Sequence, residues 1–230
     1  MKIICTAISF LFISLTFAQN GVDTPETDDY LTGKAITLPK KVLEIAGSPY
    51  AEREFQLGNV YKNGKLVANN VALRYNVSRD EIEVKGGINT SNSQARVLKR
   101  SPEIYVRVLN DVYVYVKPTT EGAPSGYFNV MLEGEKFHLY KKMKKEFIEG
   151  KKAINSVARD VKPTYQDRED LYLVNANTNV LTELSGSRNR KLKAFPSHNK
   201  ELKKYTKQEN ININKDYSLK ELVAYYNTLK

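Results

Sequence analysis

Apolar and polar residues alternate along most of the chain from residue 55 to residue 184, and this period of two predicts β-strands. The strictest alternation is in residues 81–85, so one face of that strand is expected to be exposed to water. Two pairs of turn residues mark hairpins: Asn63 with Gly64 favours a type I′ turn, and Asn110 with Asp111 gives a second hairpin signal. The predicted strands are residues 60–61, 66–67, 71–77, 81–85, 97–99, 104–108, 112–116, 127–132, 136–140, 171–174 and 180–181.

Short turns join these strands in sequence, which is typical of an antiparallel meander. The sequence therefore predicts an α+β fold that consists mainly of an antiparallel β meander, either a sandwich or a partly open barrel. A C-terminal helical cap is expected to complete it, because the apolar period changes near residue 185.

After residue 185 the apolar residues recur at helical spacing. Residues 187–195 and 199–207 are lysine-rich helical candidates, and Ser218 with Glu221 fits a capping box that opens the last helix. That helix carries an apolar stripe at positions i, i+3, i+4 and i+7, which we expect to dock on another helix or on the sheet. The stripe consists of Leu219, Leu222, Val223 and Tyr226.

The first 18 residues have the organisation of a secretory signal peptide. Lys2 gives a positive start, residues 3–17 form an apolar run that is short for a membrane span, and cleavage is expected between Ala18 and Gln19. The sequence therefore predicts an exported protein, periplasmic or secreted, with no transmembrane segment. The expected organisation is a signal peptide (1–18), a flexible acidic leader (19–37), a β-rich domain (38–184) and a C-terminal helical segment (185–230).

Basic residues are concentrated in the second half of the mature chain. Residues 19–134 contain 14 Lys and Arg against 14 Asp and Glu, whereas residues 135–230 contain 21 against 12, a surplus of 9. The densest basic cluster is a candidate contact for an anionic envelope component, and a solvated surface is the alternative interpretation. This cluster comprises Lys141, Lys142, Lys144, Lys145, Lys151 and Lys152. Export makes nucleic acid an unexpected partner.

Few residues of the mature chain suit catalysis or metal binding. The single cysteine, Cys5, lies in the signal peptide, so neither disulfides nor cysteine ligands are expected after cleavage. The two histidines are His138, which is expected to face outward from its strand with Tyr140, and His198. We predict no catalytic residue, no metal and no cofactor.

Three further groups of side chains have both a functional and a structural interpretation. Glu81 and Glu83 share a strand face, and paired carboxylates could serve glycoside hydrolysis, but we interpret them as the solvent face of that strand. Residues 167–170 lack the pattern of a calcium loop, and we interpret them as a polar turn. Three tyrosines are expected on one face of a hairpin, either packing across strands or stacking on sugars or lipids. They are Tyr105, Tyr113 and Tyr115.

Three stretches carry a resemblance to a known group of proteins. They are residues 47–83, with Gly47-Ser48-Pro49-Tyr50 and Leu73-Arg74-Tyr75-Asn76; residues 134–142; and residues 191–227, with Lys200–Tyr205 and Tyr225-Tyr226-Asn227. On these residues the chain resembles a family of uncharacterised exported proteins of Bacteroidota, of the flavobacterial type. The resemblance implies a Gram-negative envelope and no known activity, so it assigns no catalytic residue.

Together these features predict an exported, non-catalytic envelope protein with a binding or structural role. The expected partner is an anionic envelope component or another envelope protein. Two alternatives remain open: a small-ligand or lipid carrier with a β-barrel cavity, and a hydrolase of unrecognised geometry.

Overall fold

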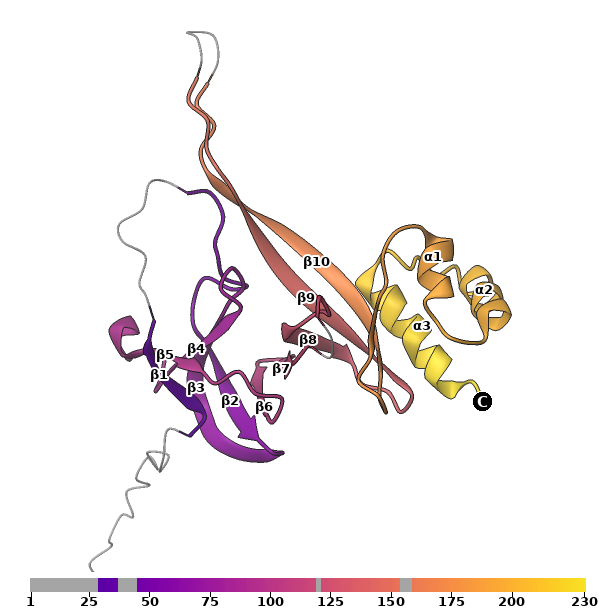
Figure 1. Ribbon diagram of the computed structural model, residues 1–230, viewed down its shortest axis with the longest axis horizontal. Helices are drawn as coiled ribbons and strands as arrows, with labels where there is room; N and C mark the ends of the chain where they lie inside the picture. Colours follow the sequence, from indigo (N-terminus) through magenta and orange to yellow (C-terminus); the bar gives the residue numbers. More distant parts are fainter. Residues whose placement is uncertain (1–28, 37–44, 119–120, 154–158) are drawn as a thin grey trace, which may run out of the picture.

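The computed structural model describes residues 29–36, 45–118, 121–153 and 159–230, and in them the chain forms an 11-stranded antiparallel sheet followed by three α-helices (Figure 1). The predicted α+β meander with a C-terminal helical cap is confirmed. The strands are β1 (Leu31–Ala35), β2 (Gln56–Lys62), β3 (Lys65–Asn76), β4 (Glu81–Lys85), β5 (Arg96–Leu98), β6 (Ile104–Val108), β7 (Asp111–Val116), β8 (Gly126–Leu132), β9 (Phe137–Ile148), β10 (Thr164–Asn175) and β11 (Leu181–Glu183). The helices are α1 (Arg188–Lys193), α2 (Asn199–Gln208) and α3 (Asp216–Thr228), and a short 3₁₀ helix spans Asn92–Gln94.

The strand order is β1-β5-β4-β3-β2-β6-β7-β8-β9-β10-β11, so β1 and β11 are the edges of an open sheet. Only residues 99–103 connect β5 to β6, although β4, β3 and β2 lie between these strands. In a flat sheet, β5 and β6 would lie four strand spacings of about 4.8 Å apart. The connecting segment could cross that distance only if it were almost fully extended. The first part of the sheet therefore curls strongly around its own core.

The concave side of the curled part encloses the larger core. Leu73, Leu98 and Val106 are completely buried there, although they come from three different strands. Three tyrosines extend this core toward the middle of the sheet: the ring of Tyr75 lies 5.3 Å from that of Tyr113 and 6.0 Å from that of Tyr127. Such tilted and edge-to-face ring pairs stabilise a core beyond the area that they bury.

The helical cap packs on the other half of the sheet, where α3 contacts β8 and β9. Its predicted apolar stripe is buried, with Leu219, Leu222 and Val223 fully covered. Asn227 fixes the orientation of α3: its Oδ1 accepts hydrogen bonds from the backbone amides of Lys136 (2.8 Å) and Phe137 (3.0 Å), and its Nδ2 donates to the Phe137 carbonyl (2.9 Å). The predicted docking of the last helix is therefore confirmed.

Two details of the helical prediction are wrong. The last helix begins at Asp216, not at Ser218, and no side chain of the N-cap residue Lys215 caps it. Ser218 lies inside the first turn and is buried, so it does not form a capping box with Glu221. Ser218 and Leu219 are buried in this turn, and packing of this kind is what stabilises most helices in proteins.

Several strand boundaries also differ from the prediction. Part of the expected flexible leader, Leu31–Ala35, is an edge strand that pairs with β5. The second hairpin turn falls on Leu109 and Asn110, one residue earlier than predicted, with Leu109 at φ 52°. The first turn is as predicted, since Asn63 and Gly64 both have the positive φ of a type I′ turn. The expected signal peptide and its cleavage site lie outside the described residues.

The largest difference concerns the hairpin of β9 and β10, in which all 12 residues of each strand are paired. β9 was expected to stop at Tyr140 and β10 to start at Leu171. The paired strands continue instead as a two-stranded ribbon that projects from the rest of the molecule (Figure 1). We call residues 143–153 and 159–169 the arm.

Candidate functional site

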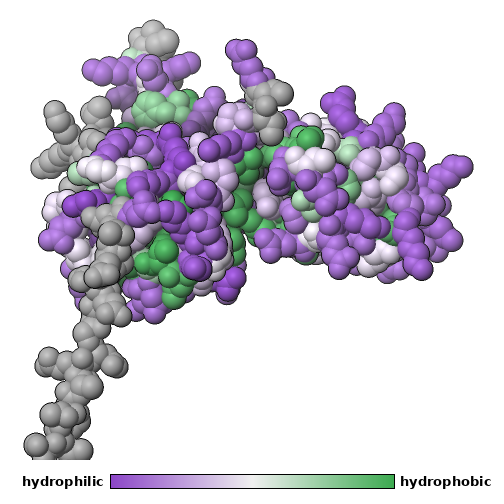
Figure 2. Space-filling model, turned by 60° about the horizontal axis from the view of Figure 1, so that its bottom comes forward, coloured by the Kyte–Doolittle hydropathy of each residue, from purple (hydrophilic) through white to green (hydrophobic). Residues whose placement is uncertain are grey.

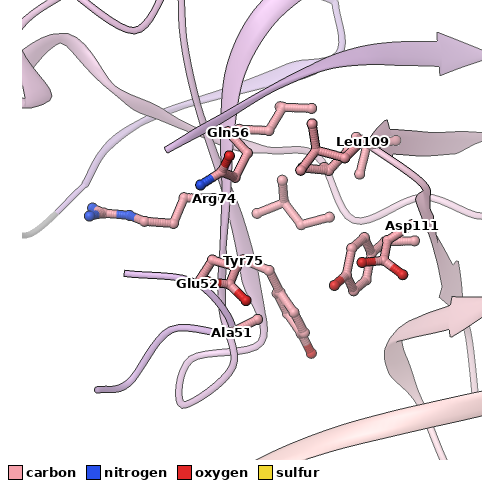
Figure 3. A pocket seen from close by; sticks show the side chains of 12 residues that line it. Ala51, Glu52, Gln56, Arg74, Tyr75, Leu109 and Asp111 are labelled. Atoms are coloured by element: carbon pink, nitrogen blue, oxygen red, sulfur yellow. The ribbon is translucent and has the colours of Figure 1, made fainter. Parts of the chain in front are cut away.

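A cavity of about 230 Å³ opens at one end of the larger core. Its floor is apolar and consists of Leu73, Ile82 and Val106, all of which are almost completely buried. The cavity exists because β3, β4 and β6 curl around this end while the segment before β2 and the β6–β7 turn stand apart (Figure 3).

The rim of the cavity is polar and acidic. Figure 3 shows Glu52 and Gln56 on one side and Leu109 and Asp111 on the other. The Asp111 carboxylate accepts a hydrogen bond of 3.0 Å from the side chain of Asn129. Among the described residues that line the cavity, Arg74 is the only basic one, and its guanidinium points away from the hollow. In a chain of net charge +10, the cavity mouth is therefore locally negative.

The tyrosines of the cavity wall stay protonated at neutral pH. Burial raises the pKa of Tyr113 well above its ordinary value, and the nearby carboxylates of Asp111 and Glu52 raise it further. Burial also raises the pKa of Tyr75, whose hydroxyl donates a hydrogen bond of 2.6 Å to Asp80. The wall therefore offers neutral phenol rings, not a phenolate base or nucleophile.

A buried ion pair on the opposite face of the sheet anchors the segment that carries Glu52. The guanidinium of Arg74 binds the carboxylate of Glu83 at 2.7 Å and lies between the rings of Tyr50 and Phe55, 3.8 and 4.2 Å from their centroids. It also donates a hydrogen bond to the Arg53 carbonyl at 3.1 Å. This planar, multiply bonded guanidinium holds one side of the cavity mouth in place.

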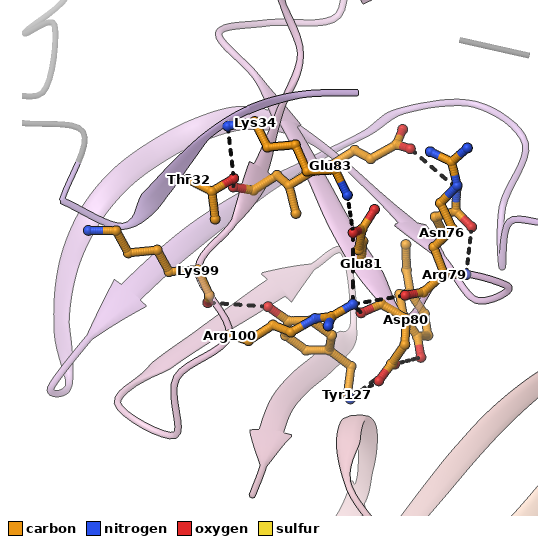
Figure 4. Close-up of polar contacts among 12 residues, drawn as sticks. Thr32, Lys34, Asn76, Arg79, Asp80, Glu81, Glu83, Lys99, Arg100 and Tyr127 are labelled. Atoms are coloured by element: carbon orange, nitrogen blue, oxygen red, sulfur yellow. Dashed lines mark hydrogen bonds and ion pairs between the residues drawn. The ribbon is translucent and has the colours of Figure 1, made fainter. Parts of the chain in front are cut away.

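Asp80 connects the curled part of the sheet to its second half (Figure 4). Its carboxylate accepts hydrogen bonds from the Tyr127 amide (3.1 Å), the Tyr75 hydroxyl and the Lys142 ammonium (2.8 Å). Gly126 makes this approach possible, because a Cβ at that position would lie 1.8 Å from a carboxylate oxygen of Asp80. The wall tyrosine Tyr75 is thereby fixed in place from below the cavity.

The lysines predicted to contact an anionic component divide into two sets. Four of them lie on β9 and form ion pairs: Lys141 with Glu169 and Asp216, Lys142 with Asp80, Lys144 with Asp170, and Lys145 with Asp167. These acidic partners come from β10, α3 and the β3–β4 turn, so the sequence order of the lysines does not reveal the pairing. Lys151 and Lys152 lie farther out on the arm and are exposed. The structure does not bring the six lysines together as one free cationic patch.

The interpretation of Glu81 and Glu83 as a solvent face is wrong. Both side chains are buried, with 8% and 1% of their surface exposed. Glu83 pairs with Arg74, and Glu81 pairs with Lys34 at 2.8 Å. Both faces of β4 are covered, because β1 and the segment around residues 50–55 lie over the face that was expected to be wet.

The three hairpin tyrosines do not share a face. Tyr105 is the strand partner of Val114 and stacks on Tyr61, with ring centroids 4.7 Å apart. Tyr113 and Tyr115 therefore lie on the other face, where Tyr115 packs against Tyr127. They serve cross-strand packing, and Tyr113 also lines the cavity.

The two histidines and the acidic segment 167–170 take part in packing and in strand pairing. His138 lies on the same face as Tyr140, as expected, but it is half-buried there: its ring stacks on that of Tyr140, and its Nδ1 accepts a hydrogen bond from the Gly134 amide at 3.2 Å. His198 contacts Tyr226. The segment read as a polar turn, residues 167–170, is instead part of strand β10. Within the described ranges, no group of three or more His, Cys, Asp or Glu side chains is placed to hold a metal ion.

Sequence reasoning missed the cavity because no local pattern marks it. Asp111 was noticed only as a turn residue, Glu52 precedes the alternating stretch, and Gln56 lies at its start. These residues come together at the cavity only because the sheet curls, and the curl depends on contacts between segments that are far apart in the sequence. Among the residues that the structure describes, no helix is long and apolar enough to cross a membrane. Comparisons with protein-family models, curated proteins and solved structures found no match for this chain.

Proposed function

We propose that the chain is an exported, non-catalytic envelope protein that binds a small ligand in the cavity at the end of the curled sheet. The observation that carries the proposal is the combination of an apolar floor with an acidic rim that the Arg74 guanidinium does not neutralise. Concave sites with apolar walls and a few convergent polar groups are the usual form of small-molecule sites.

The chemistry of the cavity favours a compact organic cation. Leu73, Ile82 and Val106 favour an apolar body, and the rings of Tyr75 and Tyr113 favour an aromatic one. Glu52 and Asp111 at the mouth favour an ammonium or another strong donor. A volume of about 230 Å³ is below that of sites for drug-sized ligands, so the ligand is expected to be small.

The alternatives receive less support. A lipid carrier needs a longer apolar lumen than this cavity provides in an open sheet. For a hydrolase, the carboxylate pair considered from the sequence was Glu81 and Glu83, and both are engaged in ion pairs with Lys34 and Arg74. A binding role therefore agrees best with the arrangement of the described side chains.

The binding proposal is tested with three compounds that differ only in their polar end: 2-phenylethylamine, 2-phenylethanol and phenylacetate. At ten times its Kd, the amine should raise the Tm by about 3–5 °C, and the acid should have no effect. The double variant Glu52→Gln, Asp111→Asn should lose most of the response to the amine. The matched control is Glu135→Gln, Glu209→Gln, which removes two exposed carboxylates elsewhere and should respond as the wild type does. Equal responses to amine and acid would contradict the proposed ligand class.

Export is tested separately by N-terminal sequencing of the protein recovered from cells. The chain is expected to begin at Gln19, because small residues at positions 16 and 18 precede the expected cleavage site. Recovery of a soluble intracellular protein that retains Met1 would contradict export without affecting the proposal for the cavity.

A further inference from the structure

The outer end of the arm exposes apolar side chains that no other part of the described chain covers. Phe147 is 47% exposed, Ile148 40% and Val161 59%. Phe147 packs its ring against that of its strand partner Tyr165, with centroids 5.3 Å apart, so the aromatic pair forms a raised apolar surface on the ribbon. Solvent-exposed apolar groups gathered at one end of a projecting element indicate a contact surface.

The ion pairs of the arm that involve described residues lie at its base. At its base Lys144, Lys145 and Arg168 form ion pairs with Asp170, Asp167 and Glu146. Lys151 and Lys152, farther out, are exposed and form no ion pair with any other described residue. Counted over residues 149–153 and 159–162, four basic residues face two acidic ones, so 4 − 2 = +2. The base is thus electrically balanced, and the outer end is positive.

We propose that the outer end of the arm docks on an anionic lipid surface. Where the outer part of the arm lies along the surface, Phe147 and Val161 reach the boundary between headgroups and acyl chains, while Lys151 and Lys152 bind the anionic headgroups. This combination of apolar and basic side chains on one element is what interfacial membrane binding requires. The proposal is independent of the cavity, because the cavity and the arm share no residue.

The shape of the molecule supports this choice of partner. The ribbon of β9 and β10 extends past the rest of the described chain, so its described outer part can contact a flat surface without the body of the molecule (Figure 1). The parallel bridge between Ala46 and Thr164 and the hydrogen bond from Tyr165 N to the Ala46 carbonyl (2.9 Å) brace one edge of the arm. Because a braced ribbon loses little conformational freedom when it docks, the entropy cost of binding is small. Shallow insertion of a few side chains is then enough for measurable binding.

Positive charge distinguishes a lipid surface from a second copy of the chain. Two arms that met end to end would bring Lys151 and Lys152 of one copy close to the same residues of the other, and like charges repel. The face of the molecule in Figure 2 is mostly hydrophilic, with hydrophobic surface in the hollow between the two halves and in a further patch on the left half. Anionic headgroups, in contrast, match both the charge and the apolar groups of the arm.

The experiment is co-sedimentation of the mature chain with vesicles at low salt. Vesicles of phosphatidylcholine alone are compared with vesicles that also contain phosphatidylglycerol. The wild type should bind the anionic vesicles and release them as salt rises, because screening shortens the reach of the lysines. Lys151→Gln, Lys152→Gln should weaken the partition constant by about 25-fold, roughly fivefold for each lysine. Phe147→Ser, Ile148→Ser should weaken binding by at least tenfold at unchanged charge.

The matched control is Lys203→Gln, Lys204→Gln, which removes two exposed lysines from α2 and should bind as the wild type does. An equal loss in this control and in the arm variant would overturn the proposal, because attraction would then reflect net charge alone. No binding of the wild type to anionic vesicles at low salt would also overturn it.

A dimer in sedimentation velocity that Phe147→Ser, Ile148→Ser disperses would identify a second copy as the occupant instead. Circular dichroism checks that each variant remains folded.

Discussion

The ammonium of Lys142 and the carboxylate of Asp80 form an ion pair of 2.8 Å between residues that are 62 positions apart. Lys142 lies on β9 and Asp80 in the turn between β3 and β4, so the contact joins the two halves of the sheet. Burial lowers the pKa of Lys142, and Asp80 opposes this effect. Because only 12% of the Lys142 side chain and 30% of the Asp80 side chain are exposed, the pair stabilises the fold mainly by satisfying charged groups that are largely shielded from solvent.

Removal of Asp80 should be more damaging than removal of its partner. Asp80→Ala leaves the Lys142 charge, the Tyr75 hydroxyl and the Tyr127 amide without their acceptor, and we expect a loss of about 2–4 kcal/mol. Lys142→Met keeps a long side chain and leaves the other contacts of Asp80 in place, so a loss of about 1 kcal/mol is expected. Urea unfolding measures both. A larger loss for Lys142→Met would show that Asp80 is not the centre of this network.

Alkaline pH should unfold the protein through its buried tyrosines. Burial raises the pKa of Tyr140 to about 12, and it raises those of Tyr75, Tyr113 and Tyr127 further. A raised tyrosine pKa stabilises the folded state fully below pH 10, where both states are protonated, and this stability is lost as the pH rises above 10 because only the unfolded state ionises.

The measurement is a pH titration of tyrosinate absorbance, together with circular dichroism. The buried four should ionise only in the step that also abolishes the β-sheet signal. Ionisation of all tyrosines in a single step near pH 10, with the sheet intact, would show that these rings are accessible to water.

Disruption of the apolar stripe of α3 should detach the helical cap. Leu222 is fully buried against the sheet, so Leu222→Asp places a charge where no solvent reaches. We expect a loss on the order of 2–4 kcal/mol, seen as a lower thermal midpoint. Lys220→Asp on the exposed side of the same helix is the control and should leave the midpoint nearly unchanged. An unchanged midpoint for Leu222→Asp would mean that the helix does not depend on this contact.

Local sequence patterns predicted the meander, the Asn63-Gly64 turn and the apolar stripe of the last helix, because each depends on residues that are close in the chain. The same patterns failed for Glu83. Alternation correctly identified its strand but could not show that Tyr50, Phe55 and Arg74 cover its outer face. A period of two says which residues share a face, and distant segments decide whether that face is wet.

The candidate site was beyond prediction for the same reason. Glu52, Leu73 and Asp111 meet only because the connection between β5 and β6 is short and forces the sheet to curl. The lysines of β9 were visible in the sequence, but the β10 carboxylates that pair with Lys141, Lys144 and Lys145 follow more than twenty residues later and looked like a polar turn. Because β9 pairs with β10, these lysines lie beside carboxylates and form ion pairs, not a free cationic patch.

The central claim is that the cavity binds a small organic cation, and nuclear magnetic resonance tests it most directly. Amide resonances of the ¹⁵N-labelled mature chain are followed as 2-phenylethylamine is added. Saturable shifts are predicted for residues 51–56, 73–75 and 106–113, which surround the cavity, with little change in the arm or in α2. Shifts confined to other parts of the chain, or no saturable shift at millimolar amine, would contradict the claim.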